Sequence, residues 1–403
     1  MADNEWTISR RGFVAGAGAL ALTGLAPAVA RGQGAPMQLG ILTPLTGAGG
    51  FDGPRMAKAM IAVVDEVNAA GGLLGRKVEL VIEDSETNPE TAVRAARKLI
   101  DVTKVPAIMG TWASAVTTAV APLCWESKVF LTTTSGADSI TKLPHQGYLI
   151  RTQPNNYLQA AKHAEFIASL GVKRCFIMSI QAPFSQPTQE RATEVLKQKG
   201  SEMVGALIYD KDKTTYRSEV DQALRTKPEM IYLNGYAPDV TILLRDLYRA
   251  GFTGGRFTQS YAMTTKVLES LPNEVTEGVI TVQPSADVGS PAYELEKKRL
   301  GISDPDNYES AATDWASLVA LAIAKAKVAT GTGIRDNVRK ISQGSGTKVY
   351  SAVEGLKLLA QGKEINYEGA SGPCEFTDIG DIVDCKFRYN KVSGGKPTFL
   401  KVA

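Results

Sequence analysis

Three short segments of the sequence carry hydroxyl side chains, small residues or an aromatic ring, and each follows an apolar run. They are GTWASA, TTTSGAD and NGYAPD, which begin at Gly110, Thr132 and Asn234. Hydroxyl groups and the free N–H groups at helix starts bind anions well, and aromatic rings cover an apolar body. These groups can hold a small molecule, but none of them is equipped to transform it.

The sequence patterns of several large enzyme classes are missing from these loops. There is no Gly-x-Gly-x-x-Gly after the first strand, no phosphate-binding Gly-Lys-Ser/Thr, no Gly-x-Ser-x-Gly and no His-Glu-x-x-His. The chain has only two histidines, His145 and His163, which we expect to lie at the surface or in helix packing. The acidic run Glu83–Glu86 has the oxygen ligands for a divalent cation, but no second oxygen-rich cluster accompanies it, which favours a solvated loop. We therefore expect no metal, no cofactor and no enzymatic activity.

The first 30 residues have the features of an export signal. Arg10 and Arg11 lie in SRRGF, a start similar to twin-arginine signals, and a Gly/Ala-rich stretch leads to AVA, which ends at Ala30. We expect cleavage near Ala30 and a soluble mature protein in the periplasm. The alternative is an N-terminal membrane anchor, for which the glycines and alanines are poorly suited.

The remaining chain alternates strands with helices. A strand from Met37 is followed by a helix that Pro54 opens and that Gly71 and Gly72 end, and the strand KVELVIE comes next. The same rhythm continues to GVITVQP, after which a long helix, shorter helices and the β segment GPCEFTDIGDIVDCKFRY close the chain. The pattern predicts an α/β protein with two doubly wound parallel-sheet lobes, split near residue 155.

Composition agrees with this class. The 403 residues suit two domains, with 44% hydrophobic and 22% charged residues. A net charge of +3 gives no reason to expect nucleic acid or an anionic membrane as partner. Because the compartment is expected to be oxidising, we predict a disulfide between Cys374 and Cys385 across the turn TDIGD, and buried free thiols at Cys124 and Cys175.

Four longer motifs carry a resemblance to a known family. They are GILTPLTG, VNAAGGLLGRKVELVIEDSETNP, IMGTWAS and NGYAPDVTILLRDLYRAGF, in this order. From Met37 onward the chain resembles the type I periplasmic binding proteins, and within them the leucine/isoleucine/valine-binding group that serves branched-chain amino acid ABC transporters. The resemblance implies lobes that close on a ligand across a three-stranded hinge. It places lobe 1 at 37–154 plus 285–386, and lobe 2 at 155–284 plus 387–403.

The resemblance also implies site residues. Ser114 matches the serine that grips the ligand carboxylate, Ser135 lies where a backbone group binds the ligand, and Tyr236 matches the aromatic residue that closes over it. Three positions depart from the amino-acid binders. Ala137 stands for a threonine and Phe184 for a usual tyrosine, while Tyr261 aligns with the acid that meets the ligand ammonium. A one-residue slip near GFTGGRF is the alternative explanation of the departure at Tyr261.

A cleft without this acid favours a ligand without an α-ammonium group, because a buried unpaired ion costs several kcal/mol. An apolar ring instead has four aromatic partners, Trp112, Phe184, Tyr236 and Tyr261. We therefore expect a periplasmic solute-binding protein that delivers a small organic, aromatic carboxylate or amide to an ABC permease, and that is a monomer. A branched-chain or other amino acid is the alternative ligand, and a ligand-sensing receptor subunit is the alternative class.

Overall fold

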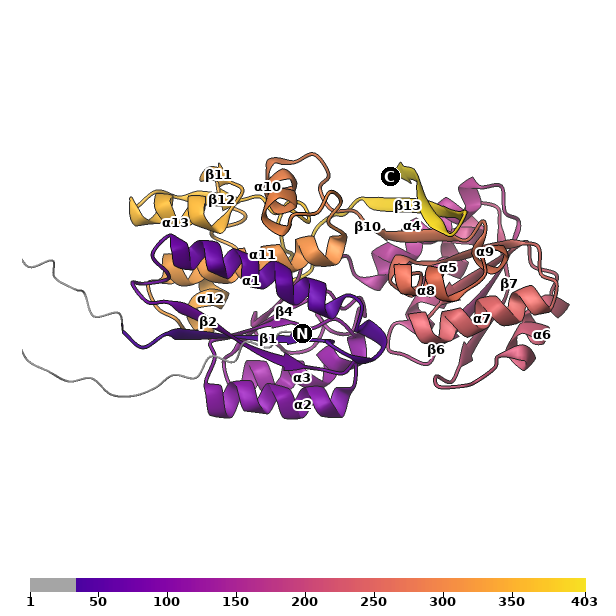
Figure 1. The fold of residues 1–403 in the computed structure, drawn as a ribbon, viewed down its shortest axis with the longest axis horizontal. Helices are drawn as coiled ribbons and strands as arrows, with labels where there is room; N and C mark the ends of the chain where they lie inside the picture. The colour runs from indigo at the N-terminus through magenta and orange to yellow at the C-terminus, as the bar shows by residue number, and fades with distance from the viewer. Residues whose placement is uncertain (1–33) are drawn as a thin grey trace, which may run out of the picture. The chain divides into compact units, whose positions relative to one another are not determined.

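The computed structural model describes residues 34–403 (Figure 1). The expected export signal, residues 1–30, lies outside the described residues. Within residues 34–403 no single helix is long and apolar enough to cross a membrane; the bent pair Asn307–Ala326 and Gly331–Asn337, at 96°, passes by length and composition only. No three His, Cys, Asp or Glu side chains in that part of the chain are grouped to hold a metal ion.

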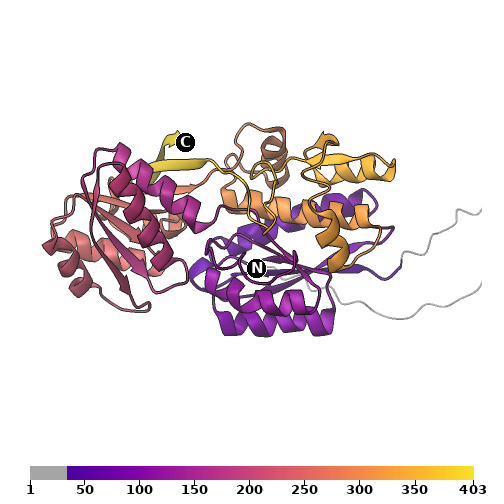
Figure 2. The same ribbon diagram turned by 180° about the vertical axis from the view of Figure 1, so that it is seen from behind.

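The first sheet is entirely parallel and has the order β2-β1-β3-β4-β5. Its strands are β1 (Met37–Thr43), β2 (Val78–Asp84), β3 (Ala107–Gly110), β4 (Phe130–Thr133) and β5 (Leu149–Arg151). The helices between these strands are α1 (Gly53–Ala69), α2 (Pro89–Arg97) and α3 (Ser114–Glu126). Helices α2 and α3 lie on one face of the sheet and α1 on the other (Figures 1 and 2). Parallel sheets covered on both faces are typical of doubly wound folds.

The second sheet has the order β14-β13-β10-β9-β8-β6-β7. Its parallel strands are β6 (Arg174–Ile180), β7 (Glu202–Tyr209), β8 (Met230–Asn234), β9 (Gly255–Gln259) and β10 (Ile280–Pro284). Two antiparallel strands, β13 (Phe387–Ser393) and β14 (Lys396–Val402), extend it beyond β10. Gly394 and Gly395, both with positive φ, form the two-residue loop between them, as the twist of such hairpins requires.

Helices surround the second sheet in the same way. They are α4 (Asn156–Ser169), α5 (Ser185–Gln198), α6 (Arg217–Arg225), α7 (Ala237–Arg249), α8 (Thr265–Ser270) and α9 (Asn273–Thr276). Helices α4 and α5 lie together on one face, and α6 and α7 lie on the other (Figures 1 and 2). Strand β6 is followed along the chain by α5, β8 by α7 and β9 by a short 3-10 helix at Ser260–Ala262.

The segment after β10 completes the cover of the first sheet. It contains α10 (Pro291–Leu300), α11 (Asn307–Ala326), α12 (Gly331–Asn337) and α13 (Ala352–Ala360), with the short pair β11 (Thr347–Val349) and β12 (Ile365–Tyr367). Helix α11 is buried over most of its length and packs along α1 (Figure 1). The polar residues that α11 buries are hydrogen-bonded, Thr313 to Glu296 and Asp314 to Tyr367, as buried polar groups require.

The chain passes between the two sheets in three places. The passages are residues 152–155, 285–290 and the stretch between β12 and β13. The membership of the strands supports the division that we propose, with 37–154 and 285–386 as lobe 1 and 155–284 and 387–403 as lobe 2.

The predicted disulfide is wrong, because Cys374 and Cys385 are free thiols. Cys374 is buried in the core cluster that contains α11, whereas Cys385 packs against the core cluster of the second sheet. The expected hairpin is limited to a turn around the isolated bridge of Phe376 and Ile382, with the Val383 N–H bonded to the Glu375 carbonyl oxygen at 3.1 Å, and the two cysteines beyond it pack into different clusters. Cys124 and Cys175 are buried and free, as predicted.

Candidate ligand-binding site

A cavity of about 40 Å³ lies where the carboxyl ends of strands from both sheets meet. This volume is far below the roughly 300–1,000 Å³ of typical small-molecule sites, so the lining must move apart before a ligand can enter. The lining comes from loops at the ends of strands in both sheets, from the first passage and from α11, and consists of Trp112, Ser114, Thr134, Gly136, Gln153, Asn156, Gln159, Phe184, Tyr236, Gln259, Tyr261 and Tyr308. The site is therefore shared between the two sheets, as expected for ligands in open α/β folds.

Helix α3 points its N-terminus at this cavity. The residue before the helix, Ala113, has no side chain that can cap it, so the first N–H groups of α3 have no side-chain acceptor. The Ser114 hydroxyl accepts a hydrogen bond from the Ala137 N–H at 3.2 Å, which leaves its own proton to donate. Free N–H groups, a hydroxyl donor and the positive end of the helix dipole together form a site for an anionic group.

The segment 134–137 is arranged differently from the expectation for its side chains. The hydroxyl of Ser135 donates to the Trp112 carbonyl oxygen at 2.9 Å and also contacts Thr117, so it points away from the cavity. Ala137 is fully buried beside Ser114 and does not line the cavity. The segment instead presents Thr134 and Gly136, two positions that the sequence analysis did not single out.

A buried guanidinium holds this segment in place. Arg151 has no exposed surface, and its Nη1 donates to the carbonyl oxygens of Ser135 and Ala137, both at 2.8 Å. Its charge is compensated by an ion pair with Asp381 and a hydrogen bond to Thr141. A buried pair of this kind fixes geometry, because removing either partner leaves an uncompensated charge in the core.

Five aromatic rings form the apolar wall of the cavity. The Trp112 ring centroid lies 5.3 Å from that of Tyr236, 5.6 Å from Tyr261 and 6.1 Å from Tyr308, while Phe184 lies 5.9 Å from Tyr236. These separations are typical of favourable aromatic pairs. Four of the rings are the ones that the sequence analysis expected, and the structure places them around one cavity. Tyr308, from the start of α11, was missed because nothing in the sequence brings that helix to the cleft.

Neutral amides complete the lining. Gln153, Asn156 and Gln159 come from the first passage and the start of α4, and Gln259 comes from the end of β9. Asn156 is fixed by hydrogen bonds from its Nδ2 to the Phe184 carbonyl oxygen and the Thr188 hydroxyl, at 3.2 and 3.0 Å. The sequence analysis treated the first passage as a connection between lobes, although its density of amides in QPNNYLQ was a usable signal.

No residue in the lining is an acid, a base or a histidine. An acid near the rings, Asp239, lies behind Tyr236 and lines a neighbouring cavity instead. Its carboxylate accepts from the Tyr236 N–H at 3.2 Å and from the Tyr209 hydroxyl, and burial raises its pKa to about 6. Burial also raises the pKa of Tyr236 and Tyr261, so both phenols stay neutral.

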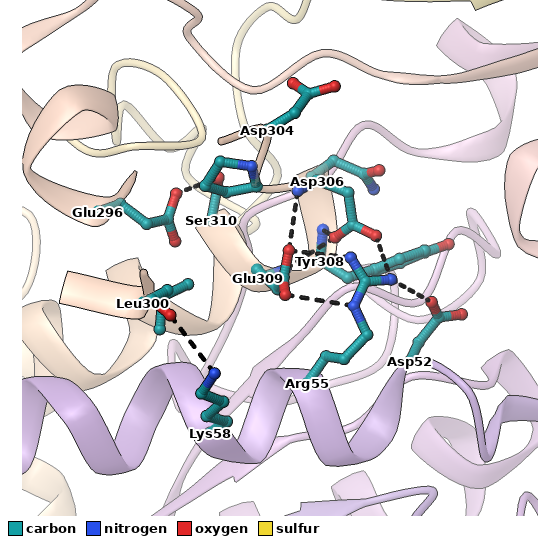
Figure 3. A network of polar contacts seen from close by, with 12 residues as sticks. Asp52, Arg55, Lys58, Glu296, Leu300, Asp304, Asp306, Tyr308, Glu309 and Ser310 are labelled. Carbon is teal, nitrogen blue, oxygen red and sulfur yellow. Dashed lines mark hydrogen bonds and ion pairs between the residues drawn. The ribbon is translucent and has the colours of Figure 1, made fainter. Parts of the chain in front are cut away.

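A charged network lies behind Tyr308 and anchors the start of α11 (Figure 3). The Arg55 guanidinium contacts Asp306 at 2.8 Å and Glu309 at 2.9 Å, and Asp52 at 3.6 Å. Asp306 and Glu309 also form the capping box of α11. Burial first, and then the charge of Asp306, raises the pKa of Asp52 well above its ordinary value. These acids are engaged with Arg55, and none of them lines the cavity.

Two α/β units with a small-molecule cavity at their shared strand ends define a solute-binding class of protein. The family model described as "Periplasmic binding protein" matches residues 36–377. The chain belongs to this family, and the resemblance to its branched-chain amino acid group is confirmed. Members of the family bind solutes and work with ABC transporter permeases, and the family implies a periplasmic or extracellular location.

Individual relatives agree with this assignment. The chain is 26% identical over 358 residues to the chemotactic signal transduction system substrate-binding protein BasB of Halobacterium salinarum, covering 85% of this chain and 84% of that protein. Its fold matches a leucine-binding protein LivK from Thermotoga maritima with a TM-score of 0.77 at 23% identity, covering 91% and 98% of the two chains. A solute-binding protein from R. palustris in complex with 4-hydroxybenzoate matches with a TM-score of 0.74 at 18% identity, covering 91% and 97%.

Proposed function

We propose that this protein is the solute-binding component of an ABC importer and that its ligand is a small aromatic carboxylate without an α-ammonium group. The ligand binds between the two lobes at the ends of the strands, and closure of the lobes presents the complex to the permease. The observation that carries the proposal is the lining of the cavity, which joins an uncapped helix N-terminus to five aromatic rings without any acidic side chain.

The carboxylate end of such a ligand suits the start of α3. Ser114 offers a hydroxyl proton, and the first N–H groups of the helix offer further donors. The helix dipole, equivalent to roughly half a positive charge, compensates an anion that leaves water. No basic side chain is needed for this, and none lines the cavity.

The other end of the cavity suits a ring rather than an amino group. Aromatic pairs contribute about 0.5–1.5 kcal/mol each beyond the burial of their surface, and five rings surround the space. An ammonium there has only neutral side chains as partners, and an uncompensated buried ion costs several kcal/mol. At about 1.4 kcal/mol for each factor of ten in Kd, leucine should bind on the order of 100-fold more weakly than a matching aromatic acid.

Branched-chain amino acids are the main alternative ligand that the family suggests. Relatives named for leucine, isoleucine and valine include BraC3 of Rhizobium johnstonii, 27% identical over 53% of this chain. Structural neighbours, by contrast, include complexes with benzoate and with 4-hydroxybenzoate. Folds at this level of identity serve both ligand types, so the lining of the cavity decides between them.

Calorimetry with two matched sets of ligands tests the proposal. Benzoate, 4-hydroxybenzoate, cinnamate and phenylpyruvate form one set, and leucine, isoleucine and valine form the other. At least one aromatic acid should bind far more tightly than every amino acid, and Tyr236→Ala should weaken it. Tyr157→Ala, an exposed tyrosine outside the cavity, is the control. Tight binding of leucine together with no response to aromatic acids would overturn the proposal.

A further inference from the structure

Gln259, a lining residue of the cavity, has one buried polar atom without a hydrogen-bond partner. The residue lies at the end of β9, is 8% exposed and lines the cavity. Its Nε2 group donates to Asn234 Oδ1 at 3.1 Å and to the Tyr232 hydroxyl at 3.4 Å, so both of its protons are used. Its carbonyl oxygen, Oε1, is buried and has no hydrogen-bond partner. A buried acceptor without a donor is costly, and such an atom in a binding cavity needs a functional explanation.

The Gln259 amide is the end of a chain of hydrogen-bonded polar side chains behind the cavity. Asn234 Nδ2 donates to the Ser179 hydroxyl at 3.2 Å, so Asn234 turns its Oδ1 towards Gln259. Ser179 also accepts from Gln189 Nε2, which a further hydrogen bond to the Leu207 carbonyl oxygen at 2.9 Å holds in place. The chain begins at a backbone carbonyl, which can only accept, and passes through the Ser179 hydroxyl, which can accept or donate. With Asn234 Nδ2 as the donor to Ser179, it ends with Gln259 Oε1 as the free acceptor.

A second set of contacts, through Tyr232 and His163, is compatible with the same orientation. The Tyr232 hydroxyl lies 2.8 Å from Nδ1 of His163, a buried residue of α4. Burial lowers the pKa of His163 to about 3, so the imidazole is neutral. With Nδ1 as acceptor of the tyrosine proton, the Tyr232 oxygen is free to accept from Gln259 Nε2. Both protons of the Gln259 amide are then directed away from the cavity.

We infer that the ligand carries a neutral hydrogen-bond donor, a hydroxyl or N–H group, that pairs with Gln259 Oε1. Ser114 and Gln259 enter the cavity from the first and second sheets, so they engage different ends of a ligand that closure traps. The inference rests on the proposed function and narrows it to an aromatic acid with a ring hydroxyl or a comparable N–H group. An ether oxygen or a second carboxylate at this place would meet the carbonyl oxygen of Gln259 and be rejected.

A ligand series with a constant carboxylate isolates this contact. Calorimetry should compare benzoate, 3- and 4-hydroxybenzoate and the two corresponding methoxybenzoates. The better hydroxybenzoate should bind at least about tenfold more tightly than benzoate and than its own methoxy ether, because it alone satisfies the buried acceptor. If the amides were reversed, Gln259 would offer its Nε2 donor to the ligand, and a methoxy oxygen, which can only accept, would pair with it. A methoxybenzoate that binds as tightly as the hydroxybenzoate or more tightly would therefore overturn the inference.

A pair of variants tests whether Gln259 is responsible. Gln259→Met keeps the length of the side chain and removes the acceptor, so the ratio of hydroxybenzoate to benzoate affinity should fall to near one. Gln186→Met removes an exposed amide of α5 that is bonded to Glu190 and does not line the cavity, and it should leave that ratio unchanged. If Gln259→Met does not fold, the benzoate, hydroxybenzoate and methoxybenzoate series on the unmodified protein still tests whether the ligand needs a hydrogen-bond donor.

The outcomes separate this inference from the proposed function. If benzoate binds as tightly as both hydroxybenzoates, the proposed function stands and the role of Gln259 is refuted. If only leucine, isoleucine or valine binds, the proposed function fails and the inference fails with it.

Discussion

Substitution of Ser114 by alanine tests the proposed carboxylate end of the site. The hydroxyl of Ser114 is buried at the start of α3 and has a proton available to donate. A hydrogen bond to a charged group contributes about 1.5–3 kcal/mol, which converts to a loss of roughly 10- to 140-fold in Kd. The substitution also removes the acceptor of the Ala137 N–H, but this loss occurs in the free and the bound protein and largely cancels in the affinity.

Isothermal titration calorimetry with the tightest aromatic acid measures this loss. Thr118→Ala is a matched control, since Thr118 lies on the same helix, donates its hydroxyl to the Ser114 carbonyl oxygen at 2.9 Å and does not line the cavity. The control should change affinity by less than about threefold, a surface-like effect of ±0.5 kcal/mol. An unchanged Kd for Ser114→Ala in a folded protein would refute the assignment of the carboxylate to α3.

Three further predictions follow from the contacts around the site and the core. Asp381→Asn leaves the buried Arg151 without its charged partner and should lower the free energy of unfolding by about 3–5 kcal/mol, which chemical denaturation measures. The control is Glu83→Gln, which removes a more exposed ion pair with Lys98 and should cost about 1 kcal/mol or less. Gly136→Ala places a Cβ 2.2 Å from Asn156 Oδ1, so overpacking of about 1–3 kcal/mol should weaken ligand binding, and equal affinity by calorimetry would argue against the position of this loop. Burial raises the pKa of Glu296 from 4.5 to about 8. Between pH 4.5 and 8 the Glu296 carboxyl is therefore protonated in the folded state and ionised in the unfolded state, so the free energy of unfolding should fall as the pH rises through this range. The free energy of unfolding of Glu296→Gln should vary less over the same range, and identical pH profiles for the two proteins would contradict the shift.

Much of the fold was predictable because apolar residues repeat every second position in a half-buried strand and every three to four positions in a helix. The alternation of apolar residues after Met37 and the glycines at 71 and 72 placed the first strand and the end of α1 well. The antiparallel pair β13 and β14 was not predicted, because strand direction depends on which edge remains free after β10 has been placed. The disulfide failed for a related reason, since Cys374 and Cys385 face different cores although they are close in sequence.

The site was predictable where it lies directly after a strand. Trp112, Ser114 and Tyr236 follow strands β3 and β8, in loops that the sequence marks by their hydroxyl and aromatic residues, whereas Tyr261, after β9, came from the resemblance to the family. Tyr308 comes from a helix nearly 200 residues away from α3 and reaches the cavity only through the packing of α11. The free acceptor of Gln259 was also beyond prediction, because it depends on the orientations of side chains on neighbouring strands.

The identity of the ligand that the protein retains through purification tests the central claim most directly. Native mass spectrometry of the freshly purified protein, followed by denaturing release and identification of the small molecule, measures it. We predict a carboxylic acid with an aromatic ring and without an α-amino group. Release of leucine, isoleucine or valine in its place would contradict the account.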